Sequence, residues 1–200
     1  PEFAINDAEQ TAIDIRLKNT VHLHACHAAD AIFTPTQWQK AQLPAVYQSK
    51  TRVIADYIDT QAVKPNQAAS VRLRKANKTF HVGDEVITFV NRNLEPYRGF
   101  HSFMRALPAV LQARPQAHAI LVGGQDVSYG KKHPSGKSWK QVMLQEVGAQ
   151  LPMERVHFVG KVPYSAYLNL LQVSACHVYL TYPFVLSWSC LESMAAGCAM

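Results

Sequence analysis

Hydrophobic and polar positions alternate along residues 86–196 in a way that predicts strands and helices in turn. Short apolar runs, which are typical of buried strands, occupy residues 86–90, 118–122, 155–159 and 177–182. After them, apolar residues recur at helical spacing over residues 100–113, 138–149, 164–173 and 188–196. This order is typical of a parallel sheet with helices on both faces, so we predict an α/β fold with a Rossmann-like sheet.

The first part of the chain has the pattern of a different unit. Helical periodicity over residues 8–29 is followed by a short strand at 31–34, a helix at 37–48 and an alternating strand at 52–58. Residues 60–70 have little apolar content and contain Pro65 and Asn66, which is typical of a linker. We therefore predict part of a second α/β domain at 1–60, a linker at 61–75 and the Rossmann-like domain at 76–200.

The segment from His177 to Gly197 runs from an apolar strand through a short turn into a helix that begins with serines. The free N–H groups of a first helical turn and the hydroxyls of Ser187 and Ser189 would together favour an anion. Glu192, one turn further on, is placed to reach sugar hydroxyls. On this segment alone the alternative stays open that Ser187 is an ordinary N-cap and Glu192 is solvated.

Two arginines follow the strand predicted at 86–90. Arg92 and Arg98 are six residues apart, and Gly99 comes next. Arginine stays charged and binds phosphate oxygens with a planar fork, so this pair is suited to clamp a diphosphate. The alternative is that both are surface salt-bridge partners.

Taken together, these segments resemble the donor domain of the family 4 (group 1) retaining glycosyltransferases, which have the GT-B fold. In that family a strand ends in an arginine, a second cation precedes a glycine, and a later helix carries the second of two glutamates eight positions apart. Arg92, Arg98, Gly99 and Glu192 match this pattern. Phe184 stands where the first glutamate would fall, so the sequence departs from the family pattern at the position of that carboxylate. Residues 31–36, 52–59 and 155–160 also look like family segments in the expected order.

The resemblance implies roles for the matching positions. The donor is a nucleoside diphosphate sugar, and the sugar is transferred with retention of configuration. The backbone at Lys161 and Val162 would hold the base, and Glu192 would hold the ribose hydroxyls. The arginines and the N–H groups around Trp188 and Ser189 would stabilise the departing phosphate. The polar connection at 123–138 is longer than most loops, and we expect it to be a mobile lid over the donor.

No metal or other cofactor is predicted, because the chain has no Asp-x-Asp motif of the kind that holds a divalent ion in many glycosyltransferases. The cluster of His22, His24, Cys26 and His27 matches no familiar zinc spacing, so a histidine-rich surface is the favoured interpretation there. The acceptor is unknown and is a saccharide, a lipid or a protein. No catalytic residue is assigned, because the motifs of the acceptor side are not found.

The composition of the chain limits the classes of partner that we expect. The chain has 200 residues, 48% of them hydrophobic, with a net charge of +6 and a pI near 9.2, which suits an anionic partner. The basic runs near 72–78 and 131–140 have only Trp139 as a stacking ring, so nucleic acid is not predicted. Four cysteines without a CxxC pair indicate reduced thiols and a cytoplasmic protein. No apolar stretch is long enough to span a membrane, although peripheral contact stays open.

We thus expect a fragment that combines the end of an acceptor domain with most of a donor domain, and that is inactive alone. Two alternatives remain: a non-catalytic nucleotide-sugar binding module and a GT-B sugar-nucleotide epimerase. Residues 177–182 would form an open sheet edge, and we expect self-association there.

Overall fold

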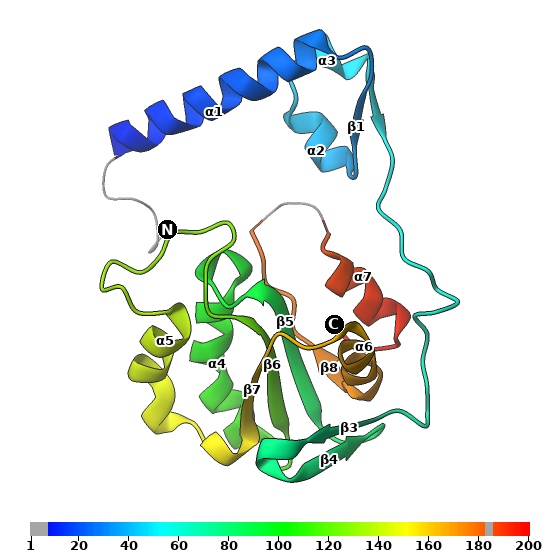
Figure 1. Ribbon diagram of the computed structural model, residues 1–200, viewed down its shortest axis with the longest axis vertical. Coiled ribbons are helices and arrows are strands. Elements are labelled where there is room, and N and C mark those ends of the chain that lie inside the picture. Colours follow the sequence, from blue (N-terminus) through cyan, green and yellow to red (C-terminus); the bar gives the residue numbers. More distant parts are fainter. Residues whose placement is uncertain (1–7, 183–185) are drawn as a thin grey trace. The chain divides into compact units, whose positions relative to one another are not determined.

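The computed structural model describes residues 8–182 and 186–200 (Figure 1). The chain divides into two compact units, Pro1–Asp56 and Tyr57–Met200.

The first unit is a small α/β arrangement around two parallel strands. Its elements are α1 (Ala8–Ala28), β1 (Ile32–Thr34), α2 (Gln37–Gln42), α3 (Ala45–Gln48) and β2 (Thr51–Val53). Ile32 lies opposite Thr51 in the parallel pair. The helix predicted at 37–48 is interrupted because Pro44 has no N–H to continue it, and the strand predicted at 52–58 ends at Val53.

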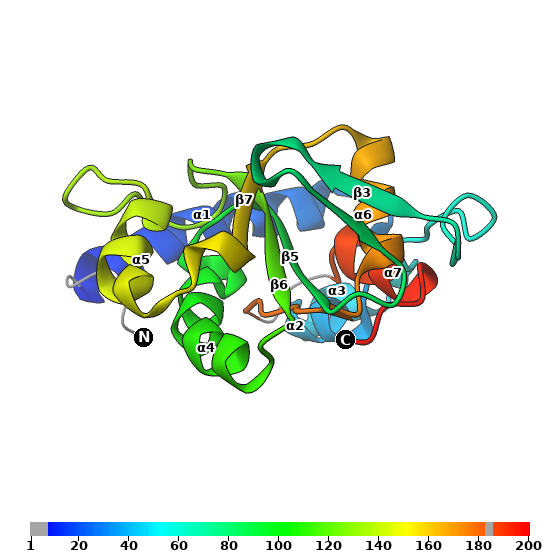
Figure 2. The ribbon, with the colours of Figure 1, turned by 90° about the horizontal axis from the view of Figure 1, so that it is seen from below.

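The second unit is built around a four-stranded parallel sheet with the order β7-β6-β5-β8. The strands are β5 (Val86–Asn93), β6 (His118–Gly124), β7 (Val156–Gly160) and β8 (Cys176–His177). Figures 1 and 2 show α4 (Phe100–Ala113) and α5 (Trp139–Val147) on one face, with α6 (Tyr164–Val173) and α7 (Trp188–Ala195) on the other. Short 3-10 turns η3 (Gly148–Gln150) and η4 (Met153–Arg155) lead into β7. The predicted α/β class with a parallel sheet is confirmed.

The central strands β5 and β6 are mostly apolar because helices cover both of their faces. Phe89 is fully buried and stacks on Phe103 of α4, with ring centroids 4.8 Å apart. On the other face, Val86 and Ile120 pack in one cluster with Leu171 of α6. Each such side chain contributes about 2 kcal/mol when it is removed from water.

A hairpin that the sequence did not predict precedes the sheet. Strands β3 (Ser70–Leu73) and β4 (Lys78–His81) pair antiparallel around the turn η1 (Arg74–Ala76), where Asn77 has a positive φ of 46°. Phe80 of this hairpin, together with Val63 and Ala69, belongs to the buried core. The range 61–75 therefore contributes core residues and a strand, and the domain ranges stay a prediction.

The strand expected at 177–182 is wrong over most of its length. β8 comprises only Cys176–His177. One more hydrogen bond to β5 follows, from the N–H of Val178 to the carbonyl of Thr88 at 2.9 Å; the chain then leaves β5, and the N–H of Tyr182 donates to the carbonyl of Tyr97 at 3.4 Å. The strand that was expected to be an open edge also pairs with a later residue of the chain: the N–H of His177 donates to the carbonyl of Ala199 at 2.7 Å. Self-association at this edge stays a prediction.

Candidate functional site

Five of the predicted site residues lie at or just after the carboxyl ends of strands: Arg92, Arg98, Gly99, Lys161 and Val162. β5 ends at Arg92 and Asn93, β6 at Gly124 and β7 at Gly160, which precedes Lys161. In a parallel sheet the carboxyl ends of all strands lie on the same side, and ligands of open α/β sheets bind at that side. The structure therefore brings the residues that follow β5, β6 and β7 to a common edge.

Arg92 of β5 and Lys161, which follows β7, both lie beside Gly124. Gly124 is the last residue of β6, the strand between β5 and β7. The space that a Cβ atom at Gly124 would take lies 3.4 Å from the carbonyl oxygen of Arg92 and 3.0 Å from Cε of Lys161. Both side chains are exposed, whereas Val162 is half-buried and packs against the core. Within residues 57–182 and 186–200, the side chain of Arg92 forms no hydrogen bond or ion pair.

Arg98 ends the 3-10 turn η2 (Pro96–Arg98) and is held on two sides. Its Nη1 donates a hydrogen bond to the hydroxyl of Thr181 at 3.3 Å. Its Cζ lies 4.7 Å from the ring centroid of Tyr129, within the range of a cation–π contact. The guanidinium is thus fixed between the segment after β8 and the loop after β6.

Gly99 makes this arrangement sterically possible. It has a φ of 76°, and its N–H donates to the carbonyl of Pro96 at 2.8 Å. A Cβ atom at this position would overlap the Cβ and carbonyl oxygen of Leu180. The glycine therefore lets the segment with Thr181 approach Arg98.

The start of α7 has the predicted serines, with Ser187 as its N-cap. The Ser187 hydroxyl accepts a hydrogen bond from the N–H of Cys190 at 3.3 Å and lies 2.8 Å from the Ser189 hydroxyl. The N–H of Ser187 donates to the hydroxyl of Tyr179 at 3.1 Å. Trp188 is 62% exposed. The amides of Trp188 and Ser189 belong to the first turn, which has no intrahelical acceptor for them.

Glu192 is buried, so the alternative of a solvated side chain is wrong. Its Oε1 accepts a hydrogen bond from the hydroxyl of Tyr164 at 2.8 Å, and its Oε2 accepts one from Tyr167 at 2.6 Å. The hydrogen bond to Glu192 raises the pKa of Tyr164, and burial together with that bond raises the pKa of Tyr167. Glu192 therefore joins α7 to α6. Its ribose contact stays a prediction.

Sequence reasoning missed two polar residues at the end of β5, Asn93 and Glu95. Glu95 is 0% exposed, and its carboxylate accepts hydrogen bonds from the amides of Ser128, Tyr129 and Gly130. The side chain of Asn93 donates from Nδ2 to the hydroxyl of Ser128 at 2.8 Å. An acidic residue between an apolar leucine and a proline was the available signal, but its partners lie more than thirty residues away.

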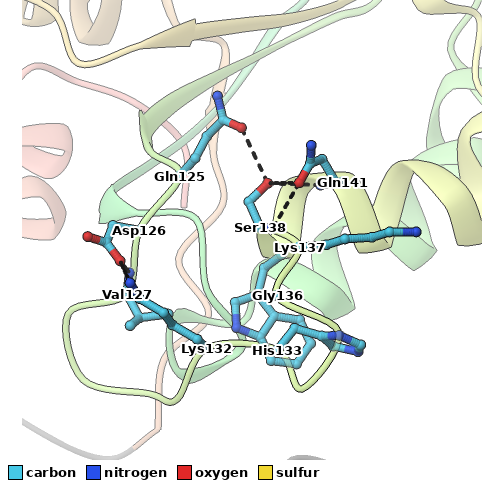
Figure 3. A pocket seen from close by; sticks show the side chains of 10 residues that line it. Gln125, Asp126, Val127, Lys132, His133, Gly136, Lys137, Ser138 and Gln141 are labelled. Carbon is cyan, nitrogen blue, oxygen red and sulfur yellow. Dashed lines mark hydrogen bonds and ion pairs between the residues drawn. The ribbon is translucent and has the colours of Figure 1, made fainter.

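The loop expected to be a lid forms a pocket of about 330 Å³ with the start of α5 (Figure 3). Ser138 is the N-cap of α5 and forms a capping box with Gln141. The indole N–H of Trp139 donates to the carbonyl of Lys131 at 2.9 Å. With its centre bound to Glu95 and its end bound to α5, the loop is fastened at two places. Basic and amide side chains line the pocket, among them Gln125, Lys132, His133 and Lys137.

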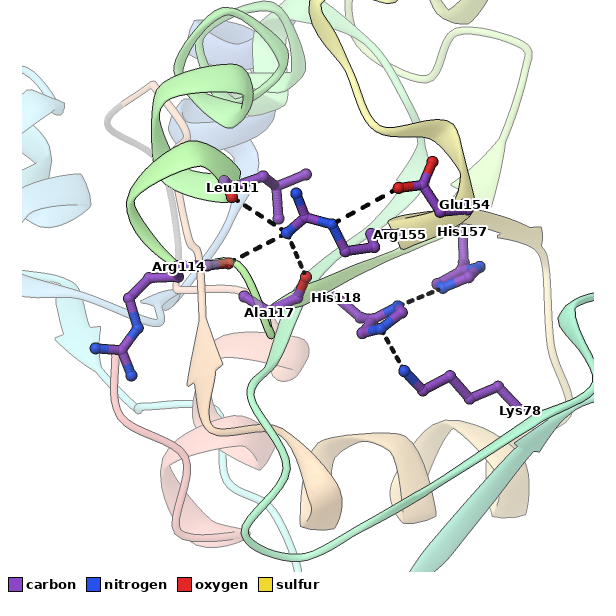
Figure 4. A network of polar contacts seen from close by, with 8 residues as sticks. All are labelled: Lys78, Leu111, Arg114, Ala117, His118, Glu154, Arg155 and His157. Carbon is purple, nitrogen blue, oxygen red and sulfur yellow. Dashed lines mark hydrogen bonds and ion pairs between the residues drawn. The ribbon is translucent and has the colours of Figure 1, made fainter.

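A second polar cluster lies at the opposite, amino end of the sheet (Figure 4). Lys78 contacts Nε2 of His118 at 2.5 Å, and Nδ1 of His118 lies 3.0 Å from Nε2 of His157. Burial, followed by the charge of Lys78, lowers the pKa of His118 to about 4, and the same two causes lower the pKa of His157. Because an ammonium only donates, Lys78 fixes both rings as neutral with their Nδ1 protonated. This cluster is structural rather than part of the candidate site.

The described part of the chain holds neither a metal cluster nor a membrane-spanning helix. Within residues 8–182 and 186–200, no three His, Cys, Asp or Glu residues are grouped as a metal site requires. In the same residues no helix has the length and apolar character needed to cross a membrane. The histidines and the cysteine between 22 and 27 lie on α1. Phe184, at which the sequence departs from the family pattern, lies outside the described residues.

Two family models match this chain. The family described as "Glycosyl transferase family 4 group" matches residues 1–63, and "Glycosyl transferases group 1" matches residues 71–200. The second match covers more than half of the chain and includes every predicted site residue. The chain therefore belongs to the group 1 glycosyl transferases.

Solved structures support the fold. The C-terminal domain of a glycosyl transferase group 1 family protein (LpcC) from Francisella tularensis matches with a TM-score of 0.54 and 17% identity, covering 72% of this chain and 68% of that one. The pneumococcal O-GlcNAc transferase GtfA, in complex with UDP and GlcNAc, has a TM-score of 0.61 and 11% identity, covering 85% of this chain and 29% of that one. The catalytic domain of starch synthase IV from Arabidopsis thaliana, bound to ADP and acarbose, has a TM-score of 0.61 and 14% identity, covering 87% and 39%.

These likenesses show the GT-B fold and no more, because the identities are low. The chain spans 29% of the length of GtfA and 39% of the starch synthase domain. No curated protein sequence matches it.

Proposed function

We propose that the protein transfers a sugar from a nucleoside diphosphate sugar to an acceptor with retention of configuration and without a metal ion, and that this chain supplies most of the donor site. GtfA was solved with UDP and starch synthase IV with ADP, which supports a nucleoside diphosphate as the group recognised. The acceptor is a saccharide, a lipid or a protein.

The observation that carries this proposal is the placement of two cations at the carboxyl edge of the sheet. The guanidinium of Arg92 has no partner among residues 57–182 and 186–200, and Arg98 is held between Thr181 and Tyr129. Two guanidinium groups offer charge-assisted hydrogen bonds that match the oxygens of a diphosphate.

The chemistry requires stabilisation of the negative charge that builds on the departing phosphate. Fixed cations and the amides of a first helical turn do this without reorganising during the reaction. Arg92, Arg98 and the amides of Trp188 and Ser189 take this role in our proposal, in place of a metal. The backbone after β7, at residues 161–162, holds the base, and Glu192 lies near the ribose.

A donor screen with product analysis tests the proposal. The full-length protein is first screened by thermal shift with UDP-, GDP-, ADP- and dTDP-sugars, and the stabilising donor is then supplied with candidate acceptors. We expect a product whose anomeric configuration, read by NMR coupling constants, equals that of the donor. An inverted product would refute retention, and stabilisation by a donor without any transfer would favour the binding module.

A further inference from the structure

We propose that Glu95 is a positioning residue of the donor site: it fixes residues 128–130 so that the ring of Tyr129 holds the guanidinium of Arg98 ready for the diphosphate. The inference rests on the proposed function, because it concerns the same site.

Glu95 is a fully buried carboxylate just after the end of β5. A carboxylate that is 0% exposed is costly to desolvate unless its oxygens are well paired. Its Oε1 accepts from the amides of Ser128 at 3.0 Å and Tyr129 at 3.2 Å, and its Oε2 accepts from the amide of Gly130 at 2.8 Å. Three successive backbone N–H groups form the kind of concavity that binds anions. Here the anion is a side chain of the protein, so the contact fastens the loop.

Asn93 provides a second link from the same strand end. Its Nδ2 donates to the Ser128 hydroxyl at 2.8 Å, next to the amides that Glu95 binds. Residues 93 and 95 thus hold the loop at adjacent points.

The fastened loop then acts on Arg98. Tyr129 carries one of the amides bound by Glu95, and its ring centroid lies 4.7 Å from Cζ of Arg98. The carbonyl oxygen of Glu95 also accepts the N–H of Arg98 at 3.1 Å, so one residue anchors both the turn and the loop. Ordering a free arginine side chain costs conformational entropy, and a ligand that meets an ordered arginine does not bear this cost.

Glutamine at position 95 is the informative substitution. Glu95→Gln keeps the shape but replaces one acceptor oxygen with an NH₂ group that faces backbone donors. Glu154→Gln is the matched control, because Glu154 is exposed and its contact with Arg155 is long, at 3.9 Å.

Hydrogen exchange tests the fastening without any ligand. In the full-length protein we expect the amides of residues 128–130 to exchange at least tenfold faster in Glu95→Gln, and to be unchanged in Glu154→Gln. Exchange at the wild-type rate in Glu95→Gln would overturn the fastening.

A double-mutant cycle tests the action on Arg98. We expect UDP and ADP to bind about tenfold more weakly to Glu95→Gln than to wild type, and Glu95→Gln to cause no further loss in an Arg98→Ala background. Tyr129→Leu should weaken binding equally while leaving the exchange of the Gly130 amide unchanged, which covers the case that Glu95→Gln fails to fold. An equal loss in both backgrounds would overturn the role.

Failure of the proposed function can be distinguished from failure of the positioning role of Glu95. If wild type bound none of UDP, ADP, GDP and dTDP, both the donor site and the positioning role would be overturned. Hydrogen exchange would still decide whether Glu95 fastens the loop.

Discussion

Gly99 and Leu180 lie so close that a Cβ atom at residue 99 would overlap the backbone carbonyl of Leu180. The positive φ of 76° adds strain for any other residue. We expect Gly99→Ala to lower the free energy of unfolding by about 2 kcal/mol or more, because backbone must move. Urea denaturation measures this.

Gly83→Ala is the control for this prediction. Gly83 also has a positive φ, 99°, but no atom lies within 4 Å of its would-be Cβ. It should cost only about 1 kcal/mol, the strain of the backbone conformation alone. Equal costs at the two glycines would show that the contact with Leu180 is unimportant.

Glu192 is expected to stabilise the packing of α7 on α6. Glu192→Ala leaves the hydroxyls of Tyr164 and Tyr167 without their acceptor, and we expect a loss of about 2 kcal/mol in the free energy of unfolding. Glu154→Ala, at an exposed position, should cost less than about 0.5 kcal/mol. Unchanged stability in Glu192→Ala would mean that the two hydrogen bonds contribute nothing.

Stability should depend on pH through His118 and His157. Their pKa values are lowered in the folded protein, that of His118 from 6.5 to about 4, so between these values the unfolded chain binds more protons. The stabilising contribution of these histidines is therefore fully present above pH 6.5 and is lost as the pH drops towards 4. This loss lowers the free energy of unfolding by about 2 kcal/mol. Urea midpoints at pH 7, 5.5 and 4.5 measure the slope.

The His118→Gln variant isolates this contribution. It should make the slope shallower than in wild type, whereas His81→Gln, at an exposed histidine of β4, should not. His177, whose burial lowers its pKa to about 4, adds to the slope equally in both variants. A slope in His118→Gln as steep as in wild type would contradict the assignment.

Transfer by the full-length protein should survive chelation, because Arg92 and Arg98 supply fixed positive charge. The initial rate is measured in EDTA and then with added magnesium or manganese. A rate that is lost in EDTA and restored by either ion would contradict the proposal of metal independence.

The sequence predicted the elements whose burial is evident from the local pattern. β5 and β6 lie in the centre of a parallel sheet, so their nearly continuous apolar runs identified them. β8 was predicted too long, because residues 180–182 approach η2 and Gly99 instead of extending the sheet. The hairpin β3–β4 was missed because its polar sequence hides a single fully buried side chain, Phe80.

The site was predicted in part for the same reason. Arg92 lies at the end of a strand, Arg98 in the turn that follows it, and Ser187 at the start of a helix, and these positions can be identified from local patterns. The partners of Glu95 and Glu192 lie 33 and 25 or more residues away in sequence, so only the folded chain reveals them. Burial of an acidic side chain by distant partners leaves little trace in the local sequence.

The central claim is that the two arginines bind a diphosphate, and calorimetric titration of the full-length protein with UDP and ADP tests it most directly. We expect Arg92→Ala and Arg98→Ala each to weaken binding tenfold or more, about 1.5 to 3 kcal/mol. Arg72→Ala, at an exposed arginine of β3, is the charge-matched control and should leave affinity unchanged. Wild-type affinity in both Arg92→Ala and Arg98→Ala would contradict the account.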